Sequence, residues 1–312
     1  MDKPDNRPIL VTGGAGFIGR HLVELLVRQG RRVRVVDLKP EPRGLSGVEY
    51  FQAELGDGAG LRDLLAGIRI IYHLAWSRIP AEADLDPAGD VSGNVISSIR
   101  LFQAAAAAGV AKVVFLSSGG TVYGVARWLP IPEDHPPAPV GVYGINNMVV
   151  EKYLEFFRIN TGLDYIILRG ANLYGEGQDL ARPVGAVGNF LNRLLHDDPI
   201  SIWGDGRVVR DFLYVGDLVR ALYLALSYKP APEDFRTFNV GTGQGRSLLN
   251  ILEIMQTVTG RTPRLNFLPP RVMDVPKNVL DCRRIAETMG WRPQVEFQEG
   301  VGKTWEWLQR GQ

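Results

Sequence analysis

Short apolar runs alternate with amphipathic segments up to about residue 170. The apolar, β-branched runs predict strands at Ile9–Thr12, Arg32–Val36, Val48–Gln52, Ile68–His73, Lys112–Ser117 and Asp164–Arg169. Apolar residues at helical spacing predict helices between them, at Phe17–Gln29, Leu61–Ala66, Gly93–Ala108 and Tyr143–Asn160. Strands that alternate with helices indicate a parallel sheet whose strands are buried on both faces.

After about residue 170 the pattern becomes less regular and the elements become shorter. Strands are predicted at Ile200–Trp203 and Val208–Val215, and helices at Leu218–Leu226, Leu248–Thr259 and Val301–Gln309. We therefore expect a sheet domain over residues 1–172, to which some later segments return, and a smaller lobe formed mainly by residues 173–312.

Composition excludes several classes of protein. Of the 312 residues, 45% are hydrophobic and 22% are charged, which is typical of a globular chain, and the net charge of +1 offers no strong field for nucleic acid or an anionic membrane. Cys282 is the only cysteine, and four scattered histidines lack metal-ligand spacing, so no metal site is predicted. No apolar run reaches the ~18 residues of a membrane span, and the polar N-terminus does not resemble a signal peptide. We expect a cytoplasmic protein.

A glycine-rich turn lies between the first predicted strand and the first predicted helix. Within Thr12–Gly19 the glycines Gly13, Gly16 and Gly19 follow a Gly-x-x-Gly-x-x-Gly spacing. Such a turn brings the backbone close to a pyrophosphate, and the N-terminus of the following helix attracts it. The context predicts dinucleotide binding by an α/β fold, namely a Rossmann-type doubly wound parallel sheet with a smaller C-terminal α/β substrate lobe.

Asp37 closes the second predicted strand, 18 residues after Gly19. A carboxylate at this place accepts hydrogen bonds from the adenosine ribose and repels a 2′-phosphate, so NAD is predicted rather than NADP. Nearby Arg34 and Arg43 leave NADP as an alternative.

Further motifs follow in order along the chain. They are His73-Leu74-Ala75, Asn94, Leu116–Gly124, Tyr143-Gly144, Arg169–Gly175, Arg210-Asp211-Phe212 and Gly290-Trp291-x-Pro293. With the glycine turn, this series resembles the extended short-chain dehydrogenase/reductase family over nearly the whole chain, in its NAD-dependent branch of nucleotide-sugar epimerases and dehydratases. The resemblance implies that tightly bound NAD takes a hydride from a sugar carbon, usually C4, and returns it to the other face. The cofactor site that it implies comprises Gly13, Gly16, Phe17, Ile18, Gly19, Asp37, Glu54, Leu55, Leu74, Ala75, Asn94, Tyr143 and Asn147.

The same resemblance implies that Tyr143 is the catalytic base, assisted by a lysine four residues later. Here that position is Asn147, which can donate a hydrogen bond but carries no charge to stabilise a phenolate. A tyrosine with a pKa near 10 is only about one-thousandth ionised at pH 7. Lys152 points to another face of the helix and does not compensate. Natural loss of activity, a repurposed site and an engineered inactive variant all remain open.

The catalytic hydroxyl group has two candidates. Many epimerases have a third serine where this chain has Gly119, so the hydroxyl comes from Ser118 or Thr121, with Ser118 favoured. Dehydratases of this branch carry an Asp and a Glu where this chain has Gly120 and Thr121, which argues against water elimination.

The resemblance also implies a site for the sugar nucleotide. Arg210 and Arg271 match two arginines that clamp the diphosphate. The other implied substrate residues are Asn172, Trp203 beside the base, Asp274 at the ribose, and Asn278, whose small side chain would admit an N-acetyl group.

The predicted function is NAD-dependent C4 epimerisation of a UDP-hexose or UDP-N-acetylhexosamine. The alternatives are a nucleotide 4-keto-sugar reductase or another sugar epimerase, and a catalytically weak sugar-nucleotide-binding protein. The resemblance further implies a homodimer that pairs the helices predicted at Gly93–Ala108 and Tyr143–Asn160, and a place in glycan or surface-polysaccharide precursor synthesis.

Overall fold

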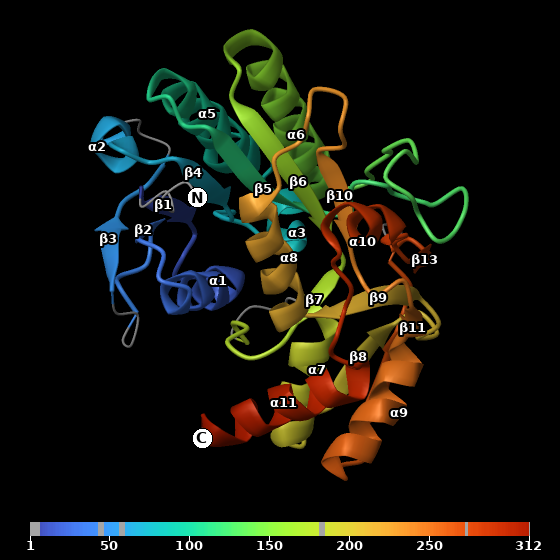
Figure 1. The fold of residues 1–312 in the computed structure, drawn as a ribbon. Coiled ribbons are helices and arrows are strands. Elements are labelled where there is room, and N and C mark those ends of the chain that lie inside the picture. The colour runs from blue at the N-terminus through green and yellow to red at the C-terminus, as the bar shows by residue number, and fades with distance from the viewer. Residues whose placement is uncertain (1–6, 43–46, 56–59, 181–184, 272–273, 312) are drawn as a thin grey trace. The chain divides into compact units, whose positions relative to one another are not determined.

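A computed structural model describes residues 7–42, 47–55, 60–180, 185–271 and 274–311 (Figure 1). It contains a seven-stranded sheet with the order β10-β6-β5-β4-β1-β2-β3. The strands are β1 (Ile9–Thr12), β2 (Val33–Asp37), β3 (Val48–Gln52), β4 (Ile70–His73), β5 (Lys112–Ser118), β6 (Asp164–Gly170) and β10 (Thr237–Val240). The pairs β1–β2, β1–β4, β2–β3 and β4–β5 are parallel.

The strand order reverses between β1 and β4. From β1 the chain proceeds to β2 and β3 on one side, and then returns to continue with β4, β5 and β6 on the other. In doubly wound sheets ligands bind at the carboxyl ends of the strands that flank such a reversal. The predicted fold class, an α/β protein with a Rossmann-type sheet, is confirmed.

Helices connect these strands. They are α1 (Phe17–Arg28), α2 (Leu61–Leu65), α3 (Pro80–Leu85), α4 (Pro87–Asp90), α5 (Ser97–Ala107), α6 (Val142–Thr161) and α8 (Val215–Ser227). A π-helical segment, η1 (Val91–Ile96), continues directly into α5. The helix predicted at Gly93–Ala108 therefore begins as a π-helix, which sequence periodicity does not distinguish from an α-helix. Helices α5 and α6 pack side by side (Figure 1).

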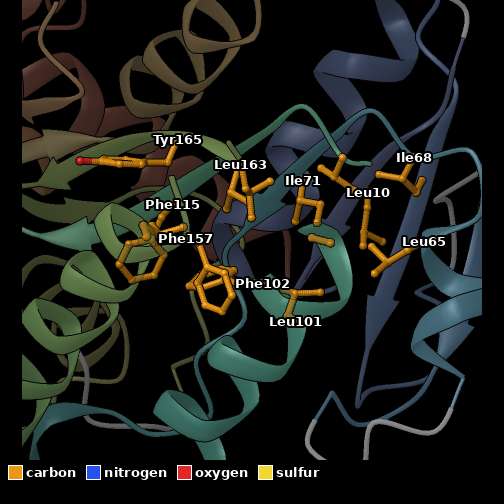
Figure 2. Packing of buried hydrophobic residues seen from close by; sticks show 14 of the residues in the cluster. Leu10, Leu65, Ile68, Ile71, Leu101, Phe102, Phe115, Phe157, Leu163 and Tyr165 are labelled. Atoms are coloured by element: carbon orange, nitrogen blue, oxygen red, sulfur yellow. The ribbon is translucent and has the colours of Figure 1, made fainter. Parts of the chain in front are cut away.

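An apolar core joins the sheet to α5 and α6. Leu10 and Ile71, from neighbouring strands, are completely buried, as are Leu101 and Phe102 of α5 (Figure 2). Phe102 also meets Phe157 of α6 edge to face, with the ring centroids 6.0 Å apart. Because both helices are held by the sheet, the residues at their N-terminal ends have fixed positions.

Lys112, at the start of β5, is buried although it carries a charge. Its Nζ donates hydrogen bonds to the carbonyl oxygens of Ala225 at 2.6 Å, Leu226 at 3.0 Å and Tyr228 at 2.8 Å. These carbonyls lie at the C-terminal end of α8, where a helix has unpaired acceptors and a partial negative charge. The ammonium group thus ties the end of α8 to the sheet.

The chain divides into two compact units. The first comprises Met1–Ser118, Gly141–Arg169 and Ala221–Phe238, and the second comprises Gly119–Val140, Gly170–Arg220 and Asn239–Gln312. The division is more interleaved than a boundary near residue 172, because Gly119–Val140 joins the second unit before the first is complete.

The second unit has two small sheets and its own core. Its strands are β7 (Asn172–Tyr174), β8 (Ile200–Trp203), β9 (Val209–Tyr214), β11 (Gly245–Ser247), β12 (Leu265–Leu268) and β13 (Lys277–Asn278). Strand β9 pairs with β7, β11 and β13, and β8 pairs with β12. Its further helices are α7 (Ala186–Leu195), α9 (Leu248–Thr259), α10 (Arg283–Met289) and α11 (Phe297–Arg310). Apolar side chains from α7, α9 and α11 form one buried cluster.

Among the residues described, no helix is long and apolar enough to cross a membrane.

Candidate functional site

The glycine turn lies between the carboxyl end of β1 and the start of α1. Gly13 has a φ of +73°, and a Cβ atom there would lie 2.8 Å from the backbone nitrogen of Ala75. A Cβ atom at Gly19 would collide with the carbonyl oxygen of Gly13. No described side chain caps the N-terminus of α1, so the N–H groups of its first turn remain available to an anion. The close-packed glycine turn and the available N–H groups of α1 together fit a dinucleotide pyrophosphate.

The carboxylate of Asp37 stabilises the same turn by accepting backbone hydrogen bonds. Its Oδ2 accepts a hydrogen bond from the Ala15 N–H at 2.9 Å, and its Oδ1 accepts one from the Lys39 N–H at 3.0 Å. Each carboxylate oxygen keeps a second lone pair, so contact with ribose hydroxyls is compatible with these bonds.

Arg34 is already engaged in the structure. Its Nε donates to Glu49 Oε2 at 2.7 Å, and its Nη1 donates to the carbonyl oxygen of Leu64 at 2.8 Å, at the end of α2. The guanidinium of Arg34 is therefore occupied by protein partners in this structure. Arg43, the other arginine considered for NADP, lies outside the described residues.

His73 connects the ends of β1 and β4. Its Nδ1 lies 2.9 Å from Thr12 Oγ1, and its Nε2 lies 2.9 Å from Ser98 Oγ. Since the Ser98 hydroxyl donates to the Asn94 carbonyl oxygen at 2.5 Å, it accepts from His73, which assigns the ring proton to Nε2. Burial lowers the pKa of His73 to about 4, so the ring is neutral at pH 7. This neutral chain of hydrogen bonds orients Thr12, which in turn accepts from the Ala75 N–H at 3.2 Å.

Asn94 lies in the π-helical segment η1 and belongs to a buried polar network. Its Oδ1 accepts from the Ser77 N–H at 2.9 Å, and its Nδ2 donates to Asp90 Oδ1 at 2.8 Å. The other oxygen of Asp90 accepts from Asn146 Nδ2 at 2.7 Å. Asp90 and Asn146 carried no signal in the sequence, because their importance depends on contacts between α4 and α6. A π-helix of this kind occurs frequently at functional sites.

Tyr143 lies in the first turn of α6 and packs against Trp76, with the ring centroids 5.5 Å apart. Burial raises the pKa of the Tyr143 phenol to about 12; hydrogen bonding by the Asn147 side chain opposes this rise, and the charge of Asp90 adds to it. Lys152 pairs with Glu155 at the surface, 3.0 Å away, and supplies no charge to the phenol.

Asn147 is completely buried on the same helix. Its Nδ2 donates to the carbonyl oxygen of Tyr143 at 2.9 Å, while its Oδ1 has no hydrogen-bond partner within the described part of the chain. The same holds for Nε1 of Trp76. A buried donor and a buried acceptor without partners are costly unless a ligand satisfies them. Since both lie beside Tyr143, the local chemistry fits the polar nicotinamide end of NAD.

The two candidate hydroxyl groups belong to different units. Ser118 is the last residue of β5 in the first unit, and Thr121 lies in the second. The preceding hydroxyl, that of Ser117, donates to the buried Glu151 Oε1 at 2.5 Å and is used structurally. Glu151 also pairs with Arg169 at 2.6 Å, which fixes α6 to the sheet one turn after Asn147.

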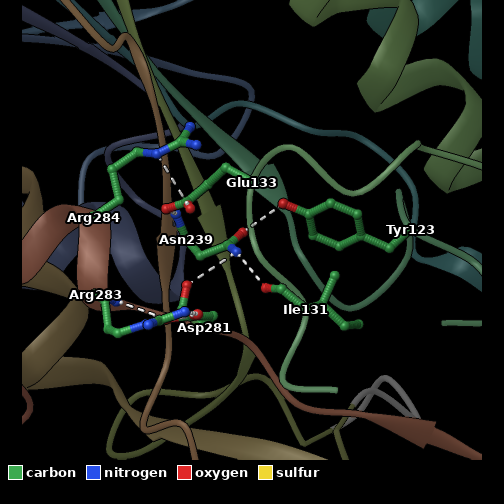
Figure 3. A network of polar contacts seen from close by, with 7 residues as sticks. All are labelled: Tyr123, Ile131, Glu133, Asn239, Asp281, Arg283 and Arg284. Carbon is green, nitrogen blue, oxygen red and sulfur yellow. Dashed lines mark hydrogen bonds and ion pairs between the residues drawn. The ribbon is translucent and has the colours of Figure 1, made fainter. Parts of the chain in front are cut away.

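A polar network holds the Gly119–Val140 segment within the second unit (Figure 3). The Tyr123 hydroxyl donates to Asn239 Oδ1 at 2.7 Å, and Asn239 Nδ2 donates to the Ile131 carbonyl oxygen at 2.8 Å. Glu133 accepts from the Asn239 N–H at 2.8 Å, and burial raises the pKa of this carboxyl group. Thr121, two residues before Tyr123, is thereby connected to an anchored stretch of chain.

Three implied substrate residues lie on the small sheet around β9. Asn172 of β7 donates from Nδ2 to the Asp211 carbonyl oxygen at 3.1 Å, and Arg210 of β9 lies opposite Asn278 of β13 in the strand register. Arg210 Nη1 donates to the Val275 carbonyl oxygen at 2.7 Å. Burial lowers the pKa of Arg210, and the nearby Asp274 carboxylate opposes this effect.

Trp203 and Arg271 form a second pair in this unit. The Arg271 guanidinium lies over the Trp203 ring, 4.1 Å from its centroid, and Trp203 is 37% exposed. Cation–π stacking orients the arginine while it leaves the N–H groups free to bind an anion.

Asn278 is completely buried, and its Nδ2 donates to the Gly119 carbonyl oxygen at 3.0 Å. It therefore supports the turn that leads to Thr121, a role that the sequence did not predict. Its Oδ1 has no partner among the described residues.

No group of three or more His, Cys, Asp or Glu residues in the described ranges could hold a metal ion.

Comparisons with known proteins identify the family of the chain. The chain is 37% identical to a UDP-glucose 4-epimerase of Mycolicibacterium smegmatis, over 96% of this chain and 97% of that one. It is 32% identical to a dTDP-4-dehydro-6-deoxyglucose reductase of Escherichia coli, over 97% and 98%. A crystal structure of UDP-glucose 4-epimerase with UDP-glucose from Thermotoga maritima superposes with a TM-score of 0.93 at 36% identity, covering 97% of this chain and 99% of that one. Residues 9–241 match the model of the NAD-dependent epimerase/dehydratase family. The resemblance inferred from the sequence motifs is confirmed, and the chain belongs to the NAD-dependent epimerase/dehydratase family.

Proposed function

We propose that the chain epimerises C4 of a UDP-linked hexose or N-acetylhexosamine through a 4-keto sugar. The observation that carries this proposal is that Tyr143 lies beside the unpartnered polar atoms of Trp76 and Asn147 in the first unit. The similarity to UDP-glucose 4-epimerases over nearly the full chain supports the reaction.

The first unit binds the cofactor. When bound, NAD supplies a reversible hydride acceptor. The glycine turn and the N-terminus of α1 hold the diphosphate, and Asp37 holds the adenosine ribose. Asn147 Oδ1 and Trp76 Nε1 offer one acceptor and one donor to the nicotinamide end.

Tyr143 removes the proton of the C4 hydroxyl group, and Ser118 or Thr121 bridges the two oxygens. With Asn147 in place of lysine, the phenol is mostly protonated at pH 7, so this step is slow. The chain can therefore bind substrate well and still turn it over slowly.

The second unit binds the sugar nucleotide. Arg210 and Arg271 bind the diphosphate, Trp203 borders the base and Asp274 binds the ribose. Asn172 and Asn278 border the sugar. A side chain as small as that of Asn278 would leave room for a 2-acetamido group.

An NMR time course at about pH 7.5 with NAD tests the proposal. UDP-glucose, UDP-galactose, UDP-GlcNAc and UDP-GalNAc are each incubated with the native chain, with Asn147→Lys and with the uncharged control Asn147→Met. We expect Asn147→Lys to interconvert C4 epimers roughly a hundredfold faster than either other protein, because the added charge lowers the pKa of the phenol. Absence of interconversion by all three proteins contradicts the assignment.

A 4-keto-sugar reductase is the second candidate. The missing lysine favours it, because a protonated Tyr143 is suited to give a proton to a ketone, and one relative is a dTDP-4-dehydro-6-deoxyglucose reductase. NADH consumption with a 4-keto nucleotide sugar and rapid exchange of cofactor would support this function. Binding of UDP-sugar with no turnover at any pH would instead indicate a binding protein.

A homodimer formed through α5 and α6 is also proposed. The side chains of Ile145, Tyr153, Phe156 and Ile159 are 36–69% exposed and follow one another at helical spacing along α6. An apolar stripe of this kind is typical of a helix that packs against a partner.

We further propose a cytoplasmic location and a role in making glycan or surface-polysaccharide precursors, in keeping with a nucleotide-sugar substrate.

A further inference from the structure

Asp90 is a carboxylate with no exposed surface. Its two oxygens accept hydrogen bonds from Asn94 Nδ2 at 2.8 Å and Asn146 Nδ2 at 2.7 Å. The orientation of the Asn94 amide is fixed independently, because its Oδ1 accepts from the Ser77 N–H. Asp90 therefore faces N–H donors, which is the arrangement that an ionised carboxylate requires.

No described cationic side chain pairs with Asp90. Two neutral amides hold it, and the nearby buried side chain at position 147 is a neutral asparagine with an unpartnered Oδ1. A buried charge is normally paired, because transfer from water is costly. This part of the first unit thus holds one negative charge without a compensating cation, in the immediate surroundings of Tyr143.

The ligand proposed for this place can supply the compensating charge. The oxidised nicotinamide ring is a cation, and uptake of a hydride converts it into the neutral dihydronicotinamide. We infer that the Asp90 carboxylate, left uncompensated by Asn147, stabilises the oxidised ring over the reduced ring and so determines the redox preference of the cofactor site. This inference rests on the proposed placement of NAD beside Tyr143 and Asn147.

The consequence for the reaction follows from the charge balance. Hydride transfer from the sugar to bound NAD would remove the positive charge that Asp90 stabilises, whereas hydride return to the ketone would restore it. The site therefore favours ketone reduction over alcohol oxidation. The substrate chemistry best suited to this bias is the reduction of a 4-keto nucleotide sugar, including the second half of an epimerisation.

Cofactor binding without any sugar tests the inference. NADH is titrated by its fluorescence and then displaced with NAD⁺, which gives the ratio of the two dissociation constants. The measurements use a Tyr143→Phe background, so that a change in phenol ionisation does not contribute. Asn147→Lys is compared with the similarly long but uncharged Asn147→Met, and Asp90→Asn is measured as an independent removal of charge.

We expect Asn147→Lys to shift the preference toward NADH by roughly tenfold relative to Asn147→Met, the order expected of one partly screened charge. For a two-electron couple, tenfold corresponds to about 30 mV. Asp90→Asn should shift the ratio of the dissociation constants in the same direction. If the Asp90→Asn protein fails to fold, the comparison of Asn147→Lys with Asn147→Met still tests the inference. If the ratio of the NADH and NAD⁺ dissociation constants differs by less than twofold between Asn147→Lys and Asn147→Met, the inference is overturned. Failure of either cofactor to bind any variant would instead overturn the proposed cofactor site, whereas an absence of epimerase activity would leave these ratios measurable.

Discussion

Burial, opposed by a hydrogen bond from Asn147, keeps the phenol of Tyr143 protonated at neutral pH. Burial and the charge of Asp90 raise the pKa of Tyr143 to about 12, and the asparagine amide opposes this only by hydrogen bonding. A cationic side chain at the same position would favour the phenolate by direct Coulomb attraction. The proposed base is therefore almost entirely protonated at neutral pH, because no cation at position 147 offsets burial.

The rate of C4 oxidation should consequently depend steeply on pH. The active form is the phenolate, so below the pKa of about 12 its population rises tenfold with each pH unit, and the native chain should gain roughly a hundredfold in kcat/KM between pH 7 and pH 9. Asn147→Lys should raise kcat/KM about a hundredfold at each pH in this range and bring the plateau of the profile down to about pH 10, because it lowers the pKa of the phenol by about two units, whereas Asn147→Met should follow the native profile. A native profile that is flat from pH 7 to 9 would rule out Tyr143 as the titrating base.

Single residues also mark what the sequence could predict. Gly13 and Asp37 could be proposed from the strand–turn–helix order in which they occur, and Tyr143 could be proposed from the family resemblance. Asp90 and Asn146 were not found, because they are 56 positions apart and meet only when α4 packs against α6. Nor could the sequence predict that Asn278 holds the Gly119 carbonyl oxygen, across 159 positions.

Among the elements, periodicity worked best for the central sheet. The six strands predicted before residue 170 are all present, with ends that differ by at most two residues. Strands such as β7 and β13 have only three and two residues and exist through their pairing with β9. Segments this short contain too few residues to show the alternation of apolar and polar positions that predicts a strand.

The contact between β5 and the end of α8 makes a prediction about stability. Lys112→Met removes three hydrogen bonds from a charged group and leaves buried carbonyl oxygens unpaired, so we expect the free energy of unfolding to fall by about 2–4 kcal/mol. Lys152→Met, which removes an exposed pair with Glu155, is the matched control and should change it by less than about 0.5 kcal/mol. Urea denaturation followed by circular dichroism measures both, and equal effects would contradict the proposed function of the buried lysine.

For the molecule as a whole, the two compact units are not successive halves of the chain, because each unit is built from three separate segments. Gly119–Val140 leaves the first unit directly after Ser118 and is anchored in the second through Tyr123, Ile131 and Glu133 (Figure 3). Their common partner is Asn239, more than 100 positions away. A single boundary near residue 172 could not capture this exchange, because it depends on long-range side-chain contacts.

The exposed stripe on α6 predicts the oligomeric state. Phe156→Glu combined with Ile159→Glu places two charges on side chains that are 52% and 69% exposed, so the monomer should fold normally while dimerisation is lost. Light scattering after size-exclusion chromatography should show a dimer for the native chain and a monomer for the variant. A native monomer, or a variant that remains dimeric, would refute a dimer formed through this face.

Return of the same hydride to C4 is the most direct test of the central claim. Asn147→Lys with bound NAD should convert UDP-[4-²H]glucose or UDP-[4-²H]GlcNAc into its C4 epimer with the deuterium retained at C4, as followed by NMR. Retention would establish oxidation and re-reduction at one carbon within one site. Loss of the label to solvent during epimerisation, or no epimer from either sugar between about pH 7 and pH 10, would contradict the assignment.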